Sequence, residues 1–416
     1  MTPIFKILMS AFTTFGAAPR AARVGSFLFF VASAADGTLM PFFALWAHDD
    51  AGIPIQYIGL LLGCYAGGEL LATPFVGGIA DRVGRRPVLL VSTCGVGFGF
   101  VLLYFARGAI ATAISLAAIG MFESVLHPTA STVIADTVPE EQRREHFALR
   151  RIMSNAGGVL GPALGALLAL YSLHLVFLGA AASILLGAVA VAAFLPETWR
   201  RGGGREDDEG EDDDENLLAL TAAFRDRRLA GLLLSVGALE IVVSWIAAIT
   251  PLYANAAGAM SASGIGLLFA YSGLLGVVFQ LPVTQASRRL SGFATIVASG
   301  TIQALAFVLL LPAPALPLLV AAMTLLAFAS MLAGPLAQAI VSELAPRNAQ
   351  ATYQAAFSVV FDLKDAAGPA VGTWLYAIST AMPWGTGIVV SVVASFALAV
   401  AARRHEAGQS KGEEGG

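Results

Sequence analysis

The chain has 416 residues, of which 57% are hydrophobic and 12% are charged, and its formal net charge is −4. A soluble domain has roughly 25% charged residues, so this composition excludes a protein whose main solvent is water. The 2 cysteines lie inside apolar runs, and the sequence has no disulfide framework or metal-ligand spacing. We therefore expect no metal ion, no cofactor and no nucleic acid partner.

Apolar runs of membrane-spanning length follow one another along the chain. A helix that crosses a bilayer needs about 20 mostly apolar residues. Arginine clusters or turns rich in Gly, Pro and polar residues separate the runs, which places their ends to within a few residues. The predicted fold class is an all-α integral membrane protein of twelve transmembrane helices. The runs are 22–46, 56–78, 87–106, 110–135, 150–170 and 173–195, then 229–255, 264–284, 293–312, 315–342, 351–378 and 383–402.

An acidic, glycine-rich stretch separates the two sets of runs. It includes residues 206–215, EDDEGEDDDE, and cannot bury enough apolar surface to fold alone. We predict a flexible acidic cytoplasmic linker over 196–228, between an N-terminal six-helix bundle, 1–195, and a C-terminal six-helix bundle, 229–402, with a cytoplasmic tail at 403–416. A patch that binds a regulatory partner is the alternative interpretation of the acidic stretch.

Short sequences recur at matching places in the two sets. Residues 58–74, IGLLLGCYAGGELLATP, resemble residues 265–282, IGLLFAYSGLLGVVFQLP, and GPALGALL at Gly161 resembles GPAVGTWL at Gly368. Duplicated bundles around a site at the middle of the membrane are typical of secondary transporters, because rocking one bundle against the other opens the site to alternate sides. We therefore predict two pseudo-symmetric six-helix bundles.

The arginines predict the orientation in the membrane, because short cytoplasmic loops accumulate Lys and Arg. With both termini in the cytoplasm, Arg107 alone falls in an outer loop. We predict a multi-pass protein of the cytoplasmic (inner) membrane with both termini cytoplasmic and no removable signal peptide. The inner positions are Arg82, Arg85, Arg86, Arg143, Arg144, Arg200, Arg201, Arg225, Arg227, Arg228, Arg288, Arg289, Arg347, Arg403 and Arg404.

The turn between the second and third runs carries a glycine- and arginine-rich motif. Residues 77–87 read GGIADRVGRRP, which resembles the signature loop of the major facilitator superfamily. The glycines allow a tight turn, and an aspartate can cap a helix or pair with an arginine as an inward gate closes. A loop that only sets topology is the alternative. The resemblance implies a conformational gate made of Gly77, Asp81, Arg82, Gly84, Arg85 and Arg86, joined by Asp136.

Residues 157–165, GGVLGPALG, resemble the glycine–proline stretch of the drug:proton antiporter branch of this superfamily. Small residues let two helices approach closely, and a proline removes one backbone hydrogen bond and bends its helix. Ala166 replaces the final glycine of the pattern, and Arg150 stands where an earlier glycine is expected. Generic small-residue packing is the alternative. The resemblance implies an exporter with an antiporter-type bend at Gly157, Gly161, Pro162 and Gly165.

The resemblance covers nearly the whole chain and extends to tetracycline-exporter-like drug efflux proteins with twelve spans. It implies the major facilitator fold, a small-molecule substrate, protons and the lipid bilayer as partners, and a monomer. One position departs from the pattern, because the arginine that these relatives carry early in the fourth span falls near Ala117 here. The chain must therefore couple protons through other residues or not at all.

Ionisable residues inside the apolar runs are the main candidates for function. A charge at the centre of a bilayer costs about 2.5–3.5 kcal/mol or more, so each one is a functional candidate. The candidates are Asp36, Glu69, Glu123, His127, Glu240, Asp362, Lys364 and Asp365.

Glu123 and His127 are the first choice for a proton site. They lie one helical turn apart and thus on one face of the fourth span. Carboxyl and imidazole groups in an apolar cavity can load and release protons under cellular gradients. Asp36 in the first span can take a proton or attract a cationic substrate, and Glu240 in the seventh span has the same two options. A structural, hydrogen-bonded role is the alternative for all of them.

Charges in the second and eleventh spans predict a link between the bundles. These two spans pack against each other in the superfamily, so we expect an ion pair between Glu69 and Lys364, with Asp362 or Asp365 as a competing partner. Desolvation offsets the Coulomb attraction of a buried pair, so the pair is weak evidence for stability. It can instead latch one conformational state, and a structural role is equally compatible with the sequence.

The sequence therefore predicts a secondary active transporter that exports small amphipathic compounds by proton-coupled antiport with alternating access. A symporter or facilitator for a metabolite such as a sugar or organic acid is the alternative, although an anionic substrate would need arginines that the first, fourth, seventh and tenth spans do not provide. A non-transporting membrane receptor with the same fold is a second alternative. An enzyme is disfavoured, because the sequence has no nucleotide loop and no nucleophile with an adjacent base.

Overall fold

The computed structural model describes residues 14–197, 224–346 and 349–413, with side chains except at 73–82, 398–413 and a few single helical positions. The described residues form helices and no strand. The first half contains α2 (Arg20–Leu45), the π-helix η1 (Trp46–Asp50) that continues it, α3 (Ile55–Val83), α4 (Arg85–Phe105), α5 (Gly108–Thr137), α6 (Glu140–Ala169) and α7 (Leu173–Phe194). The second half contains α9 (Arg227–Ser244), α10 (Ile246–Ala256), α11 (Ala262–Ser287), α12 (Gly292–Leu310), α13 (Leu316–Leu344), α14 (Gln350–Ile378) and α15 (Met382–Glu413).

Within the described part of the chain, 10 helices are long and apolar enough to cross a membrane. α9 and α10 together form one of them, Leu229–Ala256. α14 is not among them, because Asp362, Lys364 and Asp365 interrupt its apolar sequence, and the side chains of α15 are described only over the apolar segment Met382–Ala397. Every predicted run nevertheless lies on helix, so the all-α membrane fold class is confirmed.

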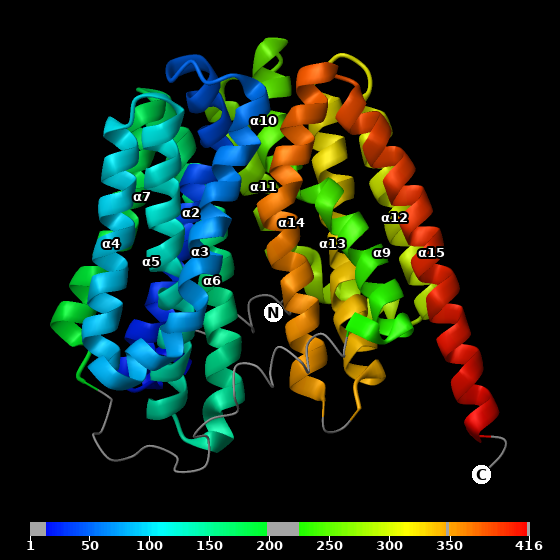
Figure 1. Cartoon of the computed structure of the whole chain (residues 1–416), viewed down its shortest axis with the longest axis horizontal. Coiled ribbons are helices and arrows are strands. Elements are labelled where there is room, and N and C mark those ends of the chain that lie inside the picture. The colour runs from blue at the N-terminus through cyan, green and yellow to red at the C-terminus, as the bar shows by residue number, and fades with distance from the viewer. Residues whose placement is uncertain (1–13, 198–223, 347–348, 414–416) are drawn as a thin grey trace. The chain divides into compact units, whose positions relative to one another are not determined.

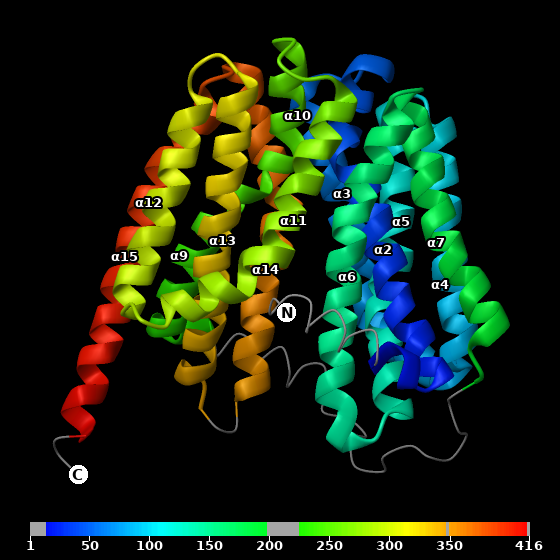
Figure 2. The ribbon, with the colours of Figure 1, turned by 180° about the vertical axis from the view of Figure 1, so that it is seen from behind.

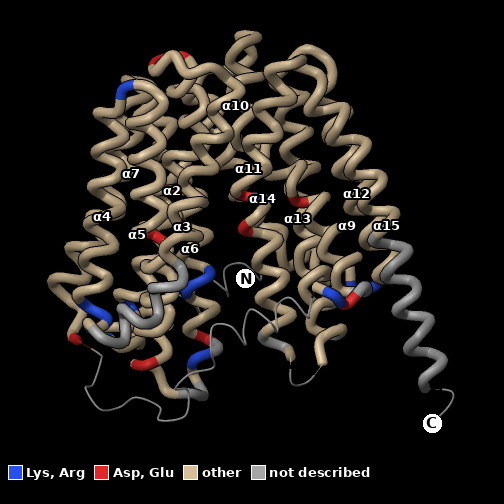
Figure 3. The backbone as a smooth tube through the Cα atoms, viewed as in Figure 1, with Lys and Arg blue, Asp and Glu red and all other residues tan. Residues whose placement is uncertain are grey.

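The first compact unit comprises residues 1–204 and 247–277. In it α2 packs against α5, α6 and α7, while α3 and α4 pack against α5, and α4 also packs against α7 (Figures 1 and 2). The end of α10 and the first part of α11 belong to this unit, where Asn255 Nδ2 donates a 3.1 Å hydrogen bond to Asp49 Oδ2. The described arginines of α2 to α7 lie mainly at the end where α3 meets α4 (Figure 3).

The second compact unit comprises residues 205–246 and 278–416. In this unit α12 packs against α13 and α15, and α9 packs against α14 and α15 (Figure 2). Its core includes Leu229 and Val236 of α9, Val341 of α13 and Phe357 of α14. The domain limits at 195, 228 and 402 stay predictions, and residues 198–223 of the predicted linker lie outside the described residues.

Candidate functional site

A cluster of acidic and hydrogen-bonding side chains lies inside the first unit, between α2, α3 and α5. Glu123 of α5 is its most buried member, at 2% exposure. The phenolic hydroxyl of Tyr65, on α3, donates a 2.8 Å hydrogen bond to Glu123 Oε2. His127 Nε2 lies 3.6 Å from Glu123 Oε1. The predicted Glu123–His127 pair is therefore present, and Tyr65 contacts the other oxygen of the same carboxylate.

Asp36 of α2 belongs to the same cluster. Its carboxyl group lies near those of Glu123 and Glu69 and interacts with the charge of both. Its Oδ1 atom is buried and has no hydrogen-bond partner among the described residues.

Glycines bring α3 close enough to α5 for Tyr65 to reach Glu123. A Cβ atom on Gly120 would collide with the carbonyl oxygen of Tyr65, and one on Gly68 would collide with the carbonyl oxygen of Ala117. Ala117, near which the family resemblance implies an arginine, thus lies at this close contact with α3.

A cationic group lies next to the acidic cluster. Arg150 of α6 places its guanidinium carbon 4.7 Å from the ring centre of Phe29 and 5.3 Å from that of Phe147. Its Nη1 atom donates a 2.9 Å hydrogen bond to Ser131 Oγ, which donates to the His127 carbonyl oxygen at 2.9 Å. The rings of Phe29 and His127 are 5.0 Å apart. Arg150, Phe29 and His127 thus form a continuous row that ends at Glu123.

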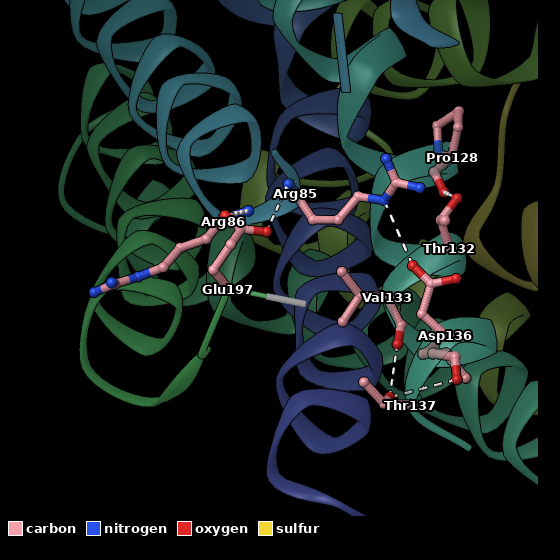
Figure 4. Close-up of polar contacts among 9 residues, drawn as sticks. Arg85, Arg86, Pro128, Thr132, Val133, Asp136, Thr137 and Glu197 are labelled. Carbon is pink, nitrogen blue, oxygen red and sulfur yellow. Dashed lines mark hydrogen bonds and ion pairs between the residues drawn. The ribbon is translucent and has the colours of Figure 1, made fainter. Parts of the chain in front are cut away.

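The gate motif is held by a network at one end of the first unit (Figure 4). Arg85 Nε lies 3.5 Å from Asp136 Oδ2, which links α4 to α5 as the family resemblance implies. Glu197, which follows α7, accepts hydrogen bonds from the backbone N–H groups of Arg85 at 3.1 Å and Arg86 at 3.3 Å. Its carboxylate therefore caps the positive N-terminus of α4.

Gly84 makes the turn between α3 and α4 possible. Its φ angle is +104°, a conformation that residues with a side chain rarely adopt, and an added Cβ would lie 2.8 Å from Glu197 Oε2. Gly77, Asp81 and Arg82 belong to α3, but their side chains lie outside the described residues. The gate function of the whole motif stays a prediction.

The residues of the predicted antiporter-type bend lie where α6 packs against α2. Added Cβ atoms on Gly157, Gly161 and Gly165 would collide with Phe30, Ala34 and Phe42 of α2, respectively. Pro162 lies inside α6, and an added Cβ on Gly37 would be 2.7 Å from its Cδ. Thr38 Oγ1 donates to the Gly161 carbonyl oxygen at 3.0 Å, and the hydroxyls of Ser33 and Ser154 are 2.7 Å apart.

The remaining candidates lie together in the second unit. Glu240 of α9 interacts with the charges of Lys364 and Asp365 on α14, and so does Asp362. Lys364 Nζ pairs with Asp365 Oδ1 at 2.8 Å, so one of the competing partners named from the sequence holds this lysine. Glu69 belongs to the first unit and Lys364 to the second, and their pairing stays a prediction.

Three residues that take part in these contacts are not predicted from the sequence. Tyr65 carries no charge, Glu197 falls in the predicted linker, and Arg150 appears only as a departure from a glycine pattern. For Tyr65 the sequence offers one signal, because Gly68 and Gly120 indicate close contact between their helices. In the described part of the chain, no group of His, Cys, Asp and Glu side chains has the arrangement of a metal site.

Comparisons with known proteins identify relatives of the chain. A family model described as Major Facilitator Superfamily matches residues 25–369 and 246–416. The tetracycline resistance protein, class C, of Escherichia coli is 29% identical over 358 residues, which cover 81% of this chain and 85% of that protein. A Na(+), Li(+), K(+)/H(+) antiporter of Planococcus maritimus is 30% identical over 177 residues, 39% of this chain and 41% of that protein. A crystal structure of a mutant of the nucleoside transporter NupG superposes with a TM-score of 0.76 at 14% identity, covering 92% of this chain and 99% of that one.

Proposed function

The chain belongs to the Major Facilitator Superfamily and is a multi-pass membrane transporter of small molecules, not an enzyme; on that premise we propose that it exports small amphipathic compounds in exchange for protons. Similarity to a tetracycline resistance protein supports a drug-like substrate, and similarity to a cation/H(+) antiporter supports proton exchange. In this proposal the protein lies in the cytoplasmic membrane, the arginine-rich end of the first bundle faces the cytoplasm, and both termini are cytoplasmic.

The buried Glu123, with Tyr65 and His127 against its carboxylate and the Asp36 carboxyl group nearby, carries the proposal. Two neighbouring carboxyl groups can hold one proton between them and lose it when a compensating positive charge approaches. His127, 3.6 Å from Glu123, is 38% exposed and connects the buried pair to more accessible surface. A proton from outside binds the pair, and its release to the cytoplasm accompanies substrate binding.

The network around Arg85 and Glu197 supplies the conformational part of the cycle. Arg85 joins α4 to Asp136 on α5, and Glu197 fixes the start of α4 to the end of α7. These contacts make that end of the six-helix bundle move as one body. Such rigidity is what alternating access by rocking bundles requires.

Proton exchange can be measured in liposomes that contain the purified protein and an internal pH dye. Under an imposed pH gradient, addition of tetracycline, lipophilic cations or neutral drugs is expected to change the rate of proton movement. Glu123→Gln and Asp36→Asn are expected to abolish the substrate-dependent part. Glu145→Gln, an exposed change on α6, is the control. If no compound moves protons while a labelled sugar or organic acid equilibrates, the chain is a facilitator and the proposal is wrong.

A further inference from the structure

Arg150 has the surroundings expected of an arginine that binds an anion from outside the protein. Among the residues whose side chains are described, no carboxylate lies within ion-pair distance of its guanidinium, and its one charged neighbour is Arg151. Of the five N–H donors of an arginine, one donates to Ser131. The head group is partly buried. An arginine left without an anion beside a membrane interior is retained for function more often than for stability.

Two aromatic rings lie beside the guanidinium of Arg150. Its central carbon is 4.7 Å from the ring centre of Phe29 and 5.3 Å from that of Phe147, within cation–π distance of both. Carboxylate, sulfonate and phosphate groups pair with the N–H edge of a guanidinium through two parallel hydrogen bonds. Phe29, which also contacts His127, provides an apolar surface next to that edge.

We propose that Arg150, with Phe29 and His127, binds the acidic group of amphipathic aromatic anions. This inference names the substrate class of the proposed exporter and rests on that function. The sequence argued against anionic substrates because the spans that line the cavity lack arginines, but the structure brings an arginine from α6 to the row of side chains that begins at Glu123. Such a substrate places its acid on Arg150 and its rings along Phe29.

Two dyes that differ by one acidic group provide the test. Anilinonaphthalene sulfonate and phenylnaphthylamine share the same rings, and only the first carries a sulfonate. Their affinities are measured by fluorescence titration of the intact protein in lipid nanodiscs, with empty nanodiscs subtracted. Arg150→Gln is expected to weaken binding of the sulfonate by about tenfold or more and to leave the neutral dye unchanged. Arg150→Lys is expected to restore only part of the affinity, because lysine lacks the planar fork.

Arg151→Gln, a change of the neighbouring exposed arginine, is the matched control and is expected to alter neither affinity. If Arg150→Gln weakens the affinity for both dyes equally, the arginine only packs against the phenyl rings. If the affinity for the sulfonate is unchanged, the arginine binds no anion. Either result overturns the inference. Because the titration needs no gradient, proton exchange with cationic drugs can persist when sulfonate binding fails, and sulfonate binding can persist when proton exchange fails.

Discussion

Tyr65 on α3 and Glu123 on α5 are joined by a 2.8 Å hydrogen bond in which the phenol donates to the carboxylate. Glu123 is thereby held between Tyr65 on one oxygen and His127 on the other, and the Asp36 carboxyl group lies nearby. In the proposed cycle, these contacts keep the Glu123 side chain in place.

Tyr65→Phe removes the donor and keeps the ring. A hydrogen bond to a charged group contributes about 1.5–3 kcal/mol, and about 1.4 kcal/mol corresponds to a factor of ten. Without the hydroxyl, Glu123 loses this contact and is held less firmly. Substrate-induced proton flux is therefore expected to fall by about tenfold. Tyr57→Phe, at an exposed position on the same helix, is the control, and an unchanged flux in Tyr65→Phe would contradict the role of the hydroxyl.

Glu197→Ala removes the carboxylate that caps α4. Loss of a helix cap costs about 1 kcal/mol, which corresponds to a fall of about 2–4 °C in melting temperature for a body of this size. The fall is expected in the thermal unfolding of the detergent-purified protein, accompanied by slower transport because α4 is released from the end of α7. Glu145→Ala is expected to change neither quantity. Equal melting temperatures for the two variants would show that the cap is not needed.

Gly161→Ala tests the close contact between α2 and α6. The added methyl group meets the carbonyl oxygen of Ala34, which is backbone and cannot move aside cheaply. Overpacking of this kind costs about 1–3 kcal/mol, so lower thermal stability and slower transport are expected. Gly158→Ala is the matched control, because an added Cβ there has nothing within 4 Å. Similar behaviour of the two variants would rule out the helix contact as the reason for the glycine.

A charge exchange tests the predicted link between Glu69 and Lys364. Glu69→Lys and Lys364→Glu are each expected to lose transport, and the double variant is expected to recover it. The same exchange between Lys364 and Asp365, which are 2.8 Å apart, distinguishes the two partners. One result would contradict the link: the double variant Lys364→Asp with Asp365→Lys transports, while the double variant that exchanges Glu69 and Lys364 does not. In that case Lys364 pairs only with Asp365, its neighbour on α14.

The sequence predicted the membrane class and the family because both depend on local information. Hydrophobic length identifies spans, and the motif at 77–87 is contiguous. Most intramembrane candidates were also visible, because a charge in an apolar run is rare. The contact between Asp36 and Glu123 could not be predicted, since it depends on how α2 is rotated and how far it is shifted along α5.

The roles of Arg150 and Glu197 could not be predicted from the sequence, because both depend on how the helices pack. Arg150 reads as a departure from a glycine pattern until α6 brings it to Phe29. Glu197 reads as the beginning of an acidic linker, and only the turn at Gly84 places the start of α4 against it. In both cases residues distant in sequence meet at a helix contact that hydropathy does not encode.

Comparison of two transport modes in Glu123→Gln tests the central claim most directly. Exchange of labelled for unlabelled substrate across liposomes at equal pH needs no net proton movement, whereas accumulation under a pH gradient does. With a substrate of the wild-type protein, the account predicts that Glu123→Gln keeps the exchange and loses the accumulation. Accumulation at the wild-type rate in Glu123→Gln would contradict it, because protons would then be carried without this carboxyl group.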